Sequence, residues 1–151
     1  MSQLSKFNKM EDIFNILSAK PYISFDHNIQ INVWPEFIDN KSSNSGDIFI
    51  WAYHIRIENK NNDNIKLLSR YWKIFDEKGN MQEVKGDGVI GEQPIIAPNS
   101  NYQYSSGVHL KYPSGIMTGK YIMKKMNDDS IFEVKIPTFS LDVPGSESII
   151  N

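Results

Sequence analysis

A stretch of six residues in the middle of the chain has the spacing of a phosphate-binding loop. Gly86, Gly88 and Gly91 form the pattern G-x-G-x-x-G, and Lys85 stands directly before it. In dinucleotide-binding proteins such a loop follows a strand and opens a helix, whose N-terminus receives the pyrophosphate. The chemistry that this motif raises is therefore the binding of a pyrophosphate or a nucleotide.

The residues after the motif argue against a dinucleotide fold. Gln93 and Pro94 follow the last glycine closely, and Pro98 comes soon after them. Two prolines so close together prevent a helix from forming there. One interpretation is a loop between strands, whose glycines supply positive φ angles. The alternative is a nest of backbone N–H groups that holds an anion, although Asp87 and Glu92 bring negative charge to the same loop.

Arg70 raises a second binding hypothesis, because Arg56 and Arg70 are the only arginines in the chain. Arg70 has the same strand parity as Trp72, which predicts a partly buried guanidinium that needs an acidic or carbonyl partner. It forms either a structural ion pair that supports the glycine loop, or a contact with an anion or a partner. The candidate ligand- or partner-binding residues are therefore Arg70, Lys85, Gly86, Asp87, Gly88, Gly91 and Gln93.

Catalytic and metal-binding patterns are weak in this sequence. It has no cysteine, which excludes thiolate zinc sites, iron–sulfur clusters and cysteine nucleophiles. His27, His54 and His109 lie in different segments without the paired spacing of a metal site, and His109 is expected in a loop. Ser105 and Ser106 qualify as nucleophiles only if a histidine base approaches them. We expect no catalytic residues, no metal ligands and no cofactor.

The elements that must position these residues are β-strands. Apolar and polar residues alternate along 29–33, 102–105 and 117–123, and only one side of a longer strand over 49–57 is expected to be buried. Residues 66–76 are expected to form a central strand that carries Trp72. The alternation changes phase at Pro137 and Thr138, which predicts a β-bulge. Short strands separated by regular turns predict an all-β sandwich or barrel of antiparallel strands.

The first 20 residues have a different pattern. Apolar residues recur there at helical spacing and Pro21 ends the run, which predicts an amphipathic helix that covers the body, binds a partner or forms a dimer. The residues of that apolar stripe are Leu4, Phe7, Met10, Phe14 and Leu17. We therefore expect a helical extension at 1–27, one domain at 28–144 and a flexible tail at 145–151.

Charge and hydropathy exclude several classes of protein. The formal net charge is −2, so the basic surface of a dedicated nucleic-acid binder is not expected. No apolar run approaches the ~20 residues of a membrane-spanning helix. Glu11 and Asp12 interrupt any signal-peptide core. A cytoplasmic protein without membrane insertion is the expectation.

Several motifs along 28–144 are specific in their order and spacing. They are FIWAYHIRIEN at 49–59, RYW at 70–72, GDGVIGEQPIIAP at 86–98, YQYSSG at 102–107, PSGIMTGKYIM at 113–123 and IPTFSL at 136–141. Together they resemble the ApaG family, whose members are fibronectin-type-III-like, or immunoglobulin-like, β-sandwich domains. Asn99 stands where the family typically has glycine, and Asn tolerates the same left-handed backbone.

The resemblance implies a limited set of functions. The family is associated with cobalt resistance and magnesium efflux, and in larger proteins its domain resembles a protein-interaction module without established catalytic residues. The leading hypothesis is a non-enzymatic domain that binds an unidentified protein through the glycine loop and adjoining strands, with a homodimer as a further option. The alternatives are a pyrophosphate or nucleotide module at Gly86–Gly91 and direct binding of Co²⁺ or Mg²⁺.

Overall fold

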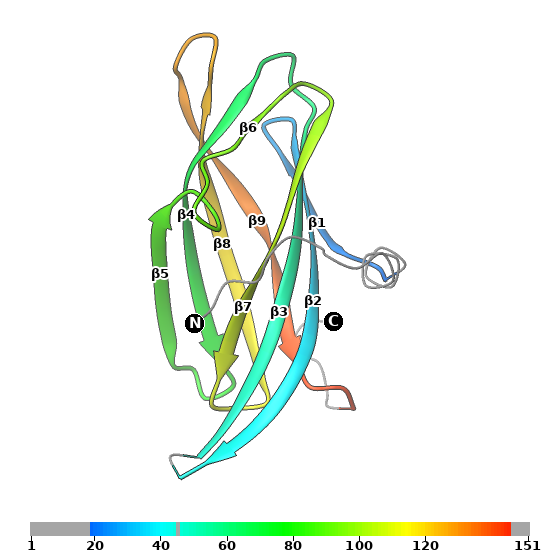
Figure 1. Cartoon of the computed structure of the whole chain (residues 1–151), viewed down its shortest axis with the longest axis vertical. Helices are drawn as coiled ribbons and strands as arrows, with labels where there is room; N and C mark the ends of the chain where they lie inside the picture. The colour runs from blue at the N-terminus through cyan, green and yellow to red at the C-terminus, as the bar shows by residue number, and fades with distance from the viewer. Residues whose placement is uncertain (1–18, 45, 146–151) are drawn as a thin grey trace.

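Alternating apolar and polar residues fold into two antiparallel sheets, seen in a computed structural model that describes residues 19–44 and 46–145. Figure 1 shows the strands running along the long axis of the molecule. In chain order they are β1 (Tyr22–Asp26), β2 (Ile29–Ser43), β3 (Gly46–Asn59), β4 (Ile65–Asp76), β5 (Met81–Asp87), β6 (Ile95–Ile96), β7 (Ser100–Leu110), β8 (Ser114–Lys125) and β9 (Ile131–Asp142).

The two sheets confirm the predicted β-sandwich. Sheet A has the strand order β1-β2-β3-β7, and sheet B has the order β5-β4-β8-β9, with β6 paired to the start of β4. No helix occurs among the described residues, and none of them forms an element long and apolar enough to be a membrane-spanning helix. The predicted helix at 1–20 falls almost entirely on residues outside the described ranges. Strand β1 pairs with β2 and lies within 1–27, so the sandwich includes residues that were expected in the extension.

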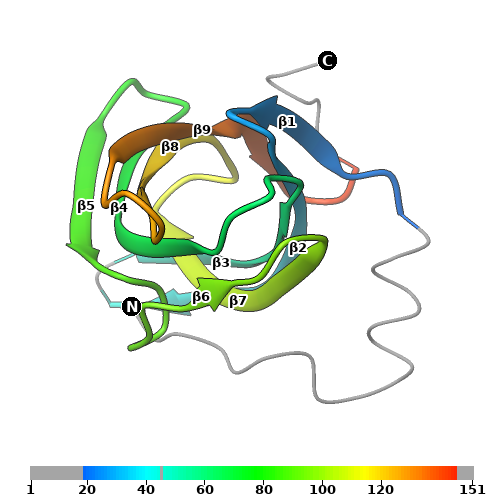
Figure 2. The same cartoon turned by 90° about the horizontal axis from the view of Figure 1, so that it is seen from above.

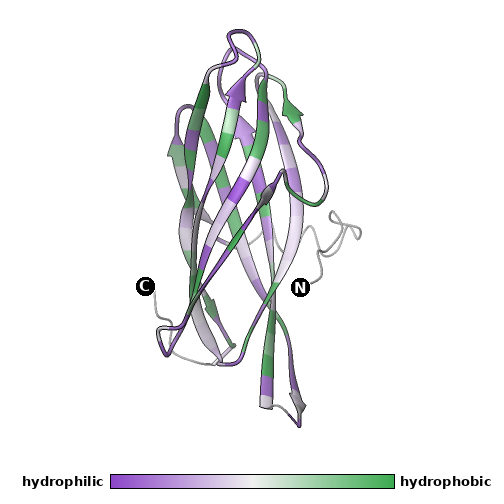
Figure 3. Ribbon diagram, turned by 90° about the vertical axis from the view of Figure 1, so that its left-hand side faces the viewer, coloured by the Kyte–Doolittle hydropathy of each residue, from purple (hydrophilic) through white to green (hydrophobic). Residues whose placement is uncertain are grey.

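The core forms where the apolar faces of the two sheets meet. Figure 3 shows hydrophobic and hydrophilic bands alternating along the strands. At its centre the rings of Tyr53, Trp72 and Phe139 pack together, with centroids 5.4 to 6.0 Å apart. Strand β4 lies between β5 and β8, which confirms the central strand that carries Trp72. Pro137 and Thr138 form the predicted bulge, because two residues of β9 lie opposite one residue of β8 there.

Two sequence expectations about histidines are wrong. His54 lies on the outer face of β3, where a polar and exposed surface was expected, but it is only 6% exposed and its neighbour Ala52 is fully buried. Part of the reason is Trp34, whose indole donates to the carbonyl of Ala19, so the chain before β1 lies over this face. His109 lies in β7 rather than in a loop.

The two long edges of the sandwich differ (Figure 2). At the edge formed by β1 and β9, here called the sealed edge, the hydroxyls of Tyr22 and Ser140 lie 3.0 Å apart and Ser24 donates to the carbonyl of Lys135 at 2.9 Å. At the edge formed by β5 and β7, here called the open edge, a cavity enters between the sheets.

Candidate functional site

The glycine loop, residues 86–94, leads from the end of β5 to β6. Gly88 and Gly91 have φ angles of +58° and +78°, in the left-handed region that favours glycine. The N–H of Gly88 donates to the carbonyl of Leu68 at 2.8 Å, and Val89 and Glu92 exchange N–H···O bonds of 2.8 and 2.9 Å. Three backbone donors of the loop are therefore bonded inside the protein and are not available to a phosphate.

Arg70 supports this loop from β4. Its Nη1 donates to the carbonyl oxygens of Asp87 at 3.1 Å and Gly88 at 2.8 Å. A Cβ at Gly86 would lie 2.9 Å from that Nη1, so the missing side chain makes room for the guanidinium. No carboxylate of residues 19–44 or 46–145 lies within ion-pair distance of Arg70. The expected structural ion pair is therefore wrong, and the supporting contact is made with carbonyl groups.

The seven candidate residues divide into an assembled group and two outlying residues. Gln93 donates to the carbonyl of Leu68 at 2.8 Å, which brings it to the same part of β4 as Arg70 and Gly88. Gly91 lies exposed in the tight turn closed by Val89 and Glu92, with no atom within 4 Å of its ideal Cβ position. The side chain of Lys85 is exposed and lies over the ring of Tyr71 instead.

Tyr71 is the centre of a group that the sequence reasoning did not find. Register pairs it with Lys85 of β5 and with Lys120 of β8. The ammonium groups of Lys73, Lys85 and Lys120 lie 6.0, 5.2 and 5.6 Å from the centroid of its ring, within cation–π range. Desolvation and the hydrogen bond to the Glu83 carboxylate, 2.9 Å long, raise the pKa of the Tyr71 hydroxyl.

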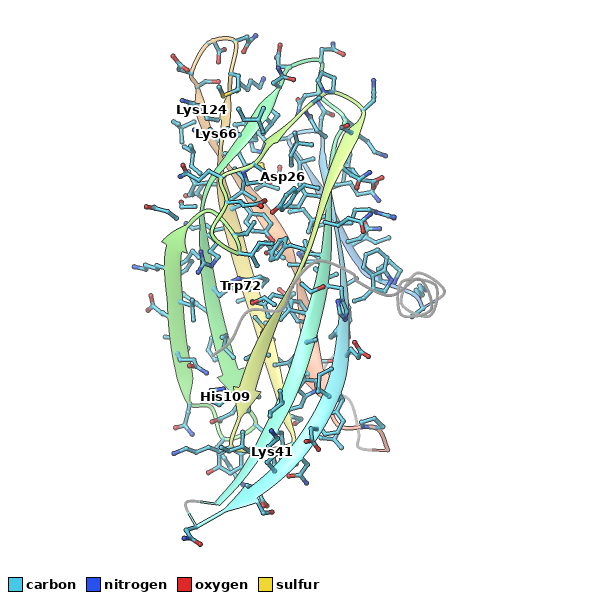
Figure 4. All side chains as sticks on the ribbon, in the orientation of Figure 1. Asp26, Lys41, Lys66, Trp72, His109 and Lys124 are labelled. Carbon is cyan, nitrogen blue, oxygen red and sulfur yellow. The ribbon has the colours of Figure 1, made fainter. Side chains whose placement is uncertain are left out.

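This outer surface of sheet B, here called the Tyr71 face, carries more lysines than acidic residues. Two shallow depressions of about 720 and 680 Å³ lie on it and share Tyr71, Lys73 and Lys120. Cross-strand pairing adds further lysines to the face, and Figure 4 labels two of them, Lys66 and Lys124, toward the end of the strands. Although the net charge of the chain is −2, its positive side chains outnumber the acidic ones on this face. The charged residues of the face are Lys66, Lys73, Lys85, Lys120, Lys124 and Lys135 against Glu83, Asp87 and Glu133, with Asp26 at the border of one depression and Asp129 paired with Lys124.

A hydrogen-bonded relay lies on the opposite side of the molecule. His54 Nδ1 is 2.6 Å from Ser105 Oγ, and His54 Nε2 is 2.8 Å from Glu36 Oε1. This provides the histidine that Ser105 would need as a nucleophile, and the connectivity is that of a serine hydrolase triad. Ser105, however, is 2% exposed and lies in the middle of β7. A substrate carbonyl cannot reach it in this arrangement, so the relay satisfies buried polar groups.

The strand patterns contained a partial signal for these groups. Tyr71 and Lys73 are two residues apart on β4 and therefore lie on the same face of the strand. Lys120 of β8 is paired with Tyr71 and lies on that face too. Only the pairing of β4 with β5 and β8 brings their side chains together. The described ranges contain no group of three or more histidine, aspartate or glutamate side chains that could hold a metal ion.

Comparison with known proteins identifies the family. The family model of the ApaG domain matches residues 39–125. The chain belongs to the ApaG family. Protein ApaG of Mesorhizobium japonicum is 42% identical over 130 residues, which cover 86% of this chain and 99% of that protein. Protein ApaG of Paramagnetospirillum magneticum is 45% identical over the same shares.

Solved structures agree with the ApaG assignment. The putative ApaA protein from Bordetella pertussis has a TM-score of 0.72 and 34% identity, covering 85% of this chain and 99% of that one. An X-ray structure from the Northeast Structural Genomics Consortium has a TM-score of 0.76 and 39% identity, covering 81% of this chain and 92% of that one. The ApaG match at 39–125 contains Arg70, Tyr71 and the whole glycine loop.

Proposed function

We propose that this ApaG-family domain is a non-enzymatic module that binds an acidic protein through the Tyr71 face. The observation that supports the proposal is the ring of Tyr71 with three ammonium groups around it. Lys120 and Lys85 already contact Glu133 at 3.0 Å and Glu83 at 3.8 Å, so an acidic partner would compete with these exposed carboxylates while it covers the ring. Complementary charge gives specificity and fast association. Two adjoining shallow depressions suit a broad protein surface better than one small ligand.

The proposal changes the surface expected from the sequence. The glycine loop, three of whose backbone donors are bonded internally, serves as a rigid border of the Tyr71 face, and Lys85 beside it contributes a charge. In this view the association of the family with cobalt resistance and magnesium efflux is indirect. It depends on the protein that the domain binds rather than on an ion held by its own side chains.

Two alternatives stay open as proposals. Tyr71 and the surrounding lysines have the chemistry to stack a base and attract a pyrophosphate, which favours this face over the loop as a nucleotide site. Calorimetric titration with ATP and a dinucleoside tetraphosphate tests the nucleotide site, and no heat at millimolar ligand would contradict it.

Direct binding of Co²⁺ or Mg²⁺ is the other alternative, and it is tested by equilibrium dialysis against each ion.

The main experiment is affinity capture from native cells with matched charge reversals. The bait proteins are the full chain, the double variant Lys73→Glu/Lys120→Glu, and the control Lys41→Glu, which lies on β2 far from the Tyr71 face (Figure 4). We expect an acidic partner that the full chain and Lys41→Glu retain and that the double variant loses. Salt should release it between about 0.1 and 0.5 M, because exposed charge pairs are screened over that range.

Equal capture by the double variant would place the partner elsewhere on the molecule and overturn the proposed surface. The non-enzymatic part has its own test. Labelling by a fluorophosphonate probe that disappears in Ser105→Ala would assign a reactive nucleophile to the relay and contradict it.

A further inference from the structure

The open edge contains a cavity of about 360 Å³ between the two sheets. Its walls come from β3, β4, β5 and β7, and they combine apolar side chains with a small number of polar groups. Such a combination is typical of binding cavities, in which few polar groups orient a ligand against apolar walls. The residues used below are Tyr53, Arg70, Trp72, Gln82, Val108 and His109.

Trp72 lines this cavity and carries an indole N–H donor that is buried at the wall. Its side chain is 1% exposed, and its Nε1 has no hydrogen-bond partner among residues 19–44 and 46–145. The other two tryptophans are satisfied, because Trp34 donates to the carbonyl of Ala19 at 3.0 Å and Trp51 to the carbonyl of Asp142 at 2.9 Å. A buried donor without an acceptor costs free energy, so an acceptor that enters beside Trp72 would stabilise the protein.

Arg70 adds a positive charge to the same cavity. Its guanidinium bonds two carbonyl groups but pairs with no carboxylate of the described residues. It also lies close enough to Tyr53 to influence that hydroxyl electrostatically. An indole N–H without an acceptor and a guanidinium without a counter-ion call for one kind of group, an oxyanion such as a carboxylate.

The rim of the cavity indicates what carries this carboxylate. β5 and β7 are the outermost strands of their sheets, so each has an unpaired backbone edge. A second depression of about 490 Å³ shares Ile74, Gln82 and His109 with the cavity and continues toward Tyr112. An elongated groove beside an unpaired strand fits an extended polypeptide, which binds by adding a strand.

We propose that the open edge binds an extended acidic segment of a partner polypeptide. The segment pairs with the free edge of β7 and places one glutamate or aspartate carboxylate in the cavity, where it accepts from Trp72 Nε1 and faces Arg70. This site lies between the sheets, whereas the Tyr71 face is the outer surface of sheet B, and Arg70 is the one described lining residue that the cavity shares with the depressions of that face. The proposal therefore does not depend on the function proposed above.

The test is NMR titration of the full chain, with the indole N–H signals of the three tryptophans as readout. The probes are the acetylated and amidated pentapeptide TVEVT, its glutamine counterpart TVQVT, and acetate alone. We expect TVEVT to shift the Trp72 signal and to leave those of Trp34 and Trp51 in place, since their acceptors are internal. TVQVT should bind at least tenfold more weakly, and acetate should need far higher concentrations.

Two matched variants distinguish binding in the cavity from a general effect of added negative charge. Gln82→Glu adds a negative charge at an exposed residue that lines the cavity, and it should weaken TVEVT binding about tenfold. Gln103→Glu adds the same charge to β7 outside the cavity lining and should leave the affinity unchanged. The Lys73→Glu/Lys120→Glu variant should bind TVEVT normally, which separates this site from the Tyr71 face.

Three results would overturn the proposal. An unchanged Trp72 indole signal would mean that the peptide carboxylate does not accept a hydrogen bond from Trp72 Nε1. Equal affinity for TVEVT and TVQVT would remove the carboxylate. Acetate as effective as TVEVT would make the cavity a small-anion site without a strand-binding groove.

Discussion

At the sealed edge, β1 and β9 bring the two sheets together with their own hydrogen bonds, Tyr22 to Ser140 and Ser24 to Lys135. At the open edge, β5 and β7 stand at the ends of their sheets and leave a cavity. Within the described part of the chain, the Trp72 indole N–H at its wall has no acceptor, and the Arg70 guanidinium bonds carbonyl groups without a carboxylate counter-ion. A sandwich must cover or blunt its strand edges to avoid unwanted pairing. This protein covers one edge with its own chain and leaves at the other the groups that a partner would satisfy.

The glycine loop closes one end of the open edge. Gln93 ties it to β4 through the carbonyl of Leu68, and Glu92 ties it to β7 by accepting from the hydroxyl of Tyr102. Desolvation and this bond to Glu92 raise the pKa of the Tyr102 hydroxyl. The glycine loop therefore connects β4 and β7 at this end of the open edge.

The largest effect on the free energy of unfolding is expected from a substitution at Gly88, in the loop that closes one end of the open edge. A Cβ at Gly88 would lie 1.9 Å from the backbone oxygen of Glu92, whereas nothing lies within 4 Å of one at Gly91, and both glycines have positive φ. Gly88→Ala should cost about 3–5 kcal/mol of unfolding free energy, from backbone strain plus overpacking. Gly91→Ala should cost about 1–2 kcal/mol, from strain alone. Urea unfolding measures both, and equal costs would show that the contact with Glu92 is unimportant.

An alkaline loss of stability comes next in size. Tyr104 of β7 and Tyr121 of β8 share a hydrogen bond across the core, and burial raises the pKa of both hydroxyls. Above pH ~10 the unfolded chain releases these protons and the folded chain keeps them, so the free energy of unfolding falls as pH rises. The expected slope is about 1.4 kcal/mol per pH unit for each tyrosine. Melting temperatures from pH 8 to 11 measure it. Tyr121→Phe should remove the contribution of one tyrosine, while Tyr53, Tyr71 and Tyr102, whose pKa values are also raised, keep theirs.

The smallest effect is expected from a comparison, at pH 7, of one hydroxyl in the core with one at the sealed edge. Tyr121→Phe leaves the Tyr104 hydroxyl buried without its partner and should cost about 1–3 kcal/mol. Tyr22→Phe removes the sealed-edge bond, but Ser140 keeps its 2.6 Å bond to Asp142, so about 0.5–1 kcal/mol is expected. A larger cost for Tyr22→Phe in urea titration would mean that the sealed edge, rather than the core bond between the sheets, limits stability.

Much of the fold could be predicted because strand patterns are local. The two-residue period, the central strand with Trp72 and the bulge at Pro137 and Thr138 all follow from residues that are close in sequence. The candidate site was predicted less well. The structure brings Arg70 and the glycine loop together, but Arg70 meets carbonyl groups instead of a carboxylate. His54 and Ser105, far apart in sequence, meet only because β3 pairs with β7.

The sequence by itself determined that this chain forms antiparallel strands, that no helix follows Gly91, and that its motifs resemble the ApaG family. Those properties depend on backbone preferences and side-chain alternation, which act over a few residues. Tertiary structure alone decided that lysines surround Tyr71, that Trp72 Nε1 has no acceptor among the described residues, and that one edge of the sandwich is open. Each of these depends on strand order and register, which bring together residues that the sequence separates.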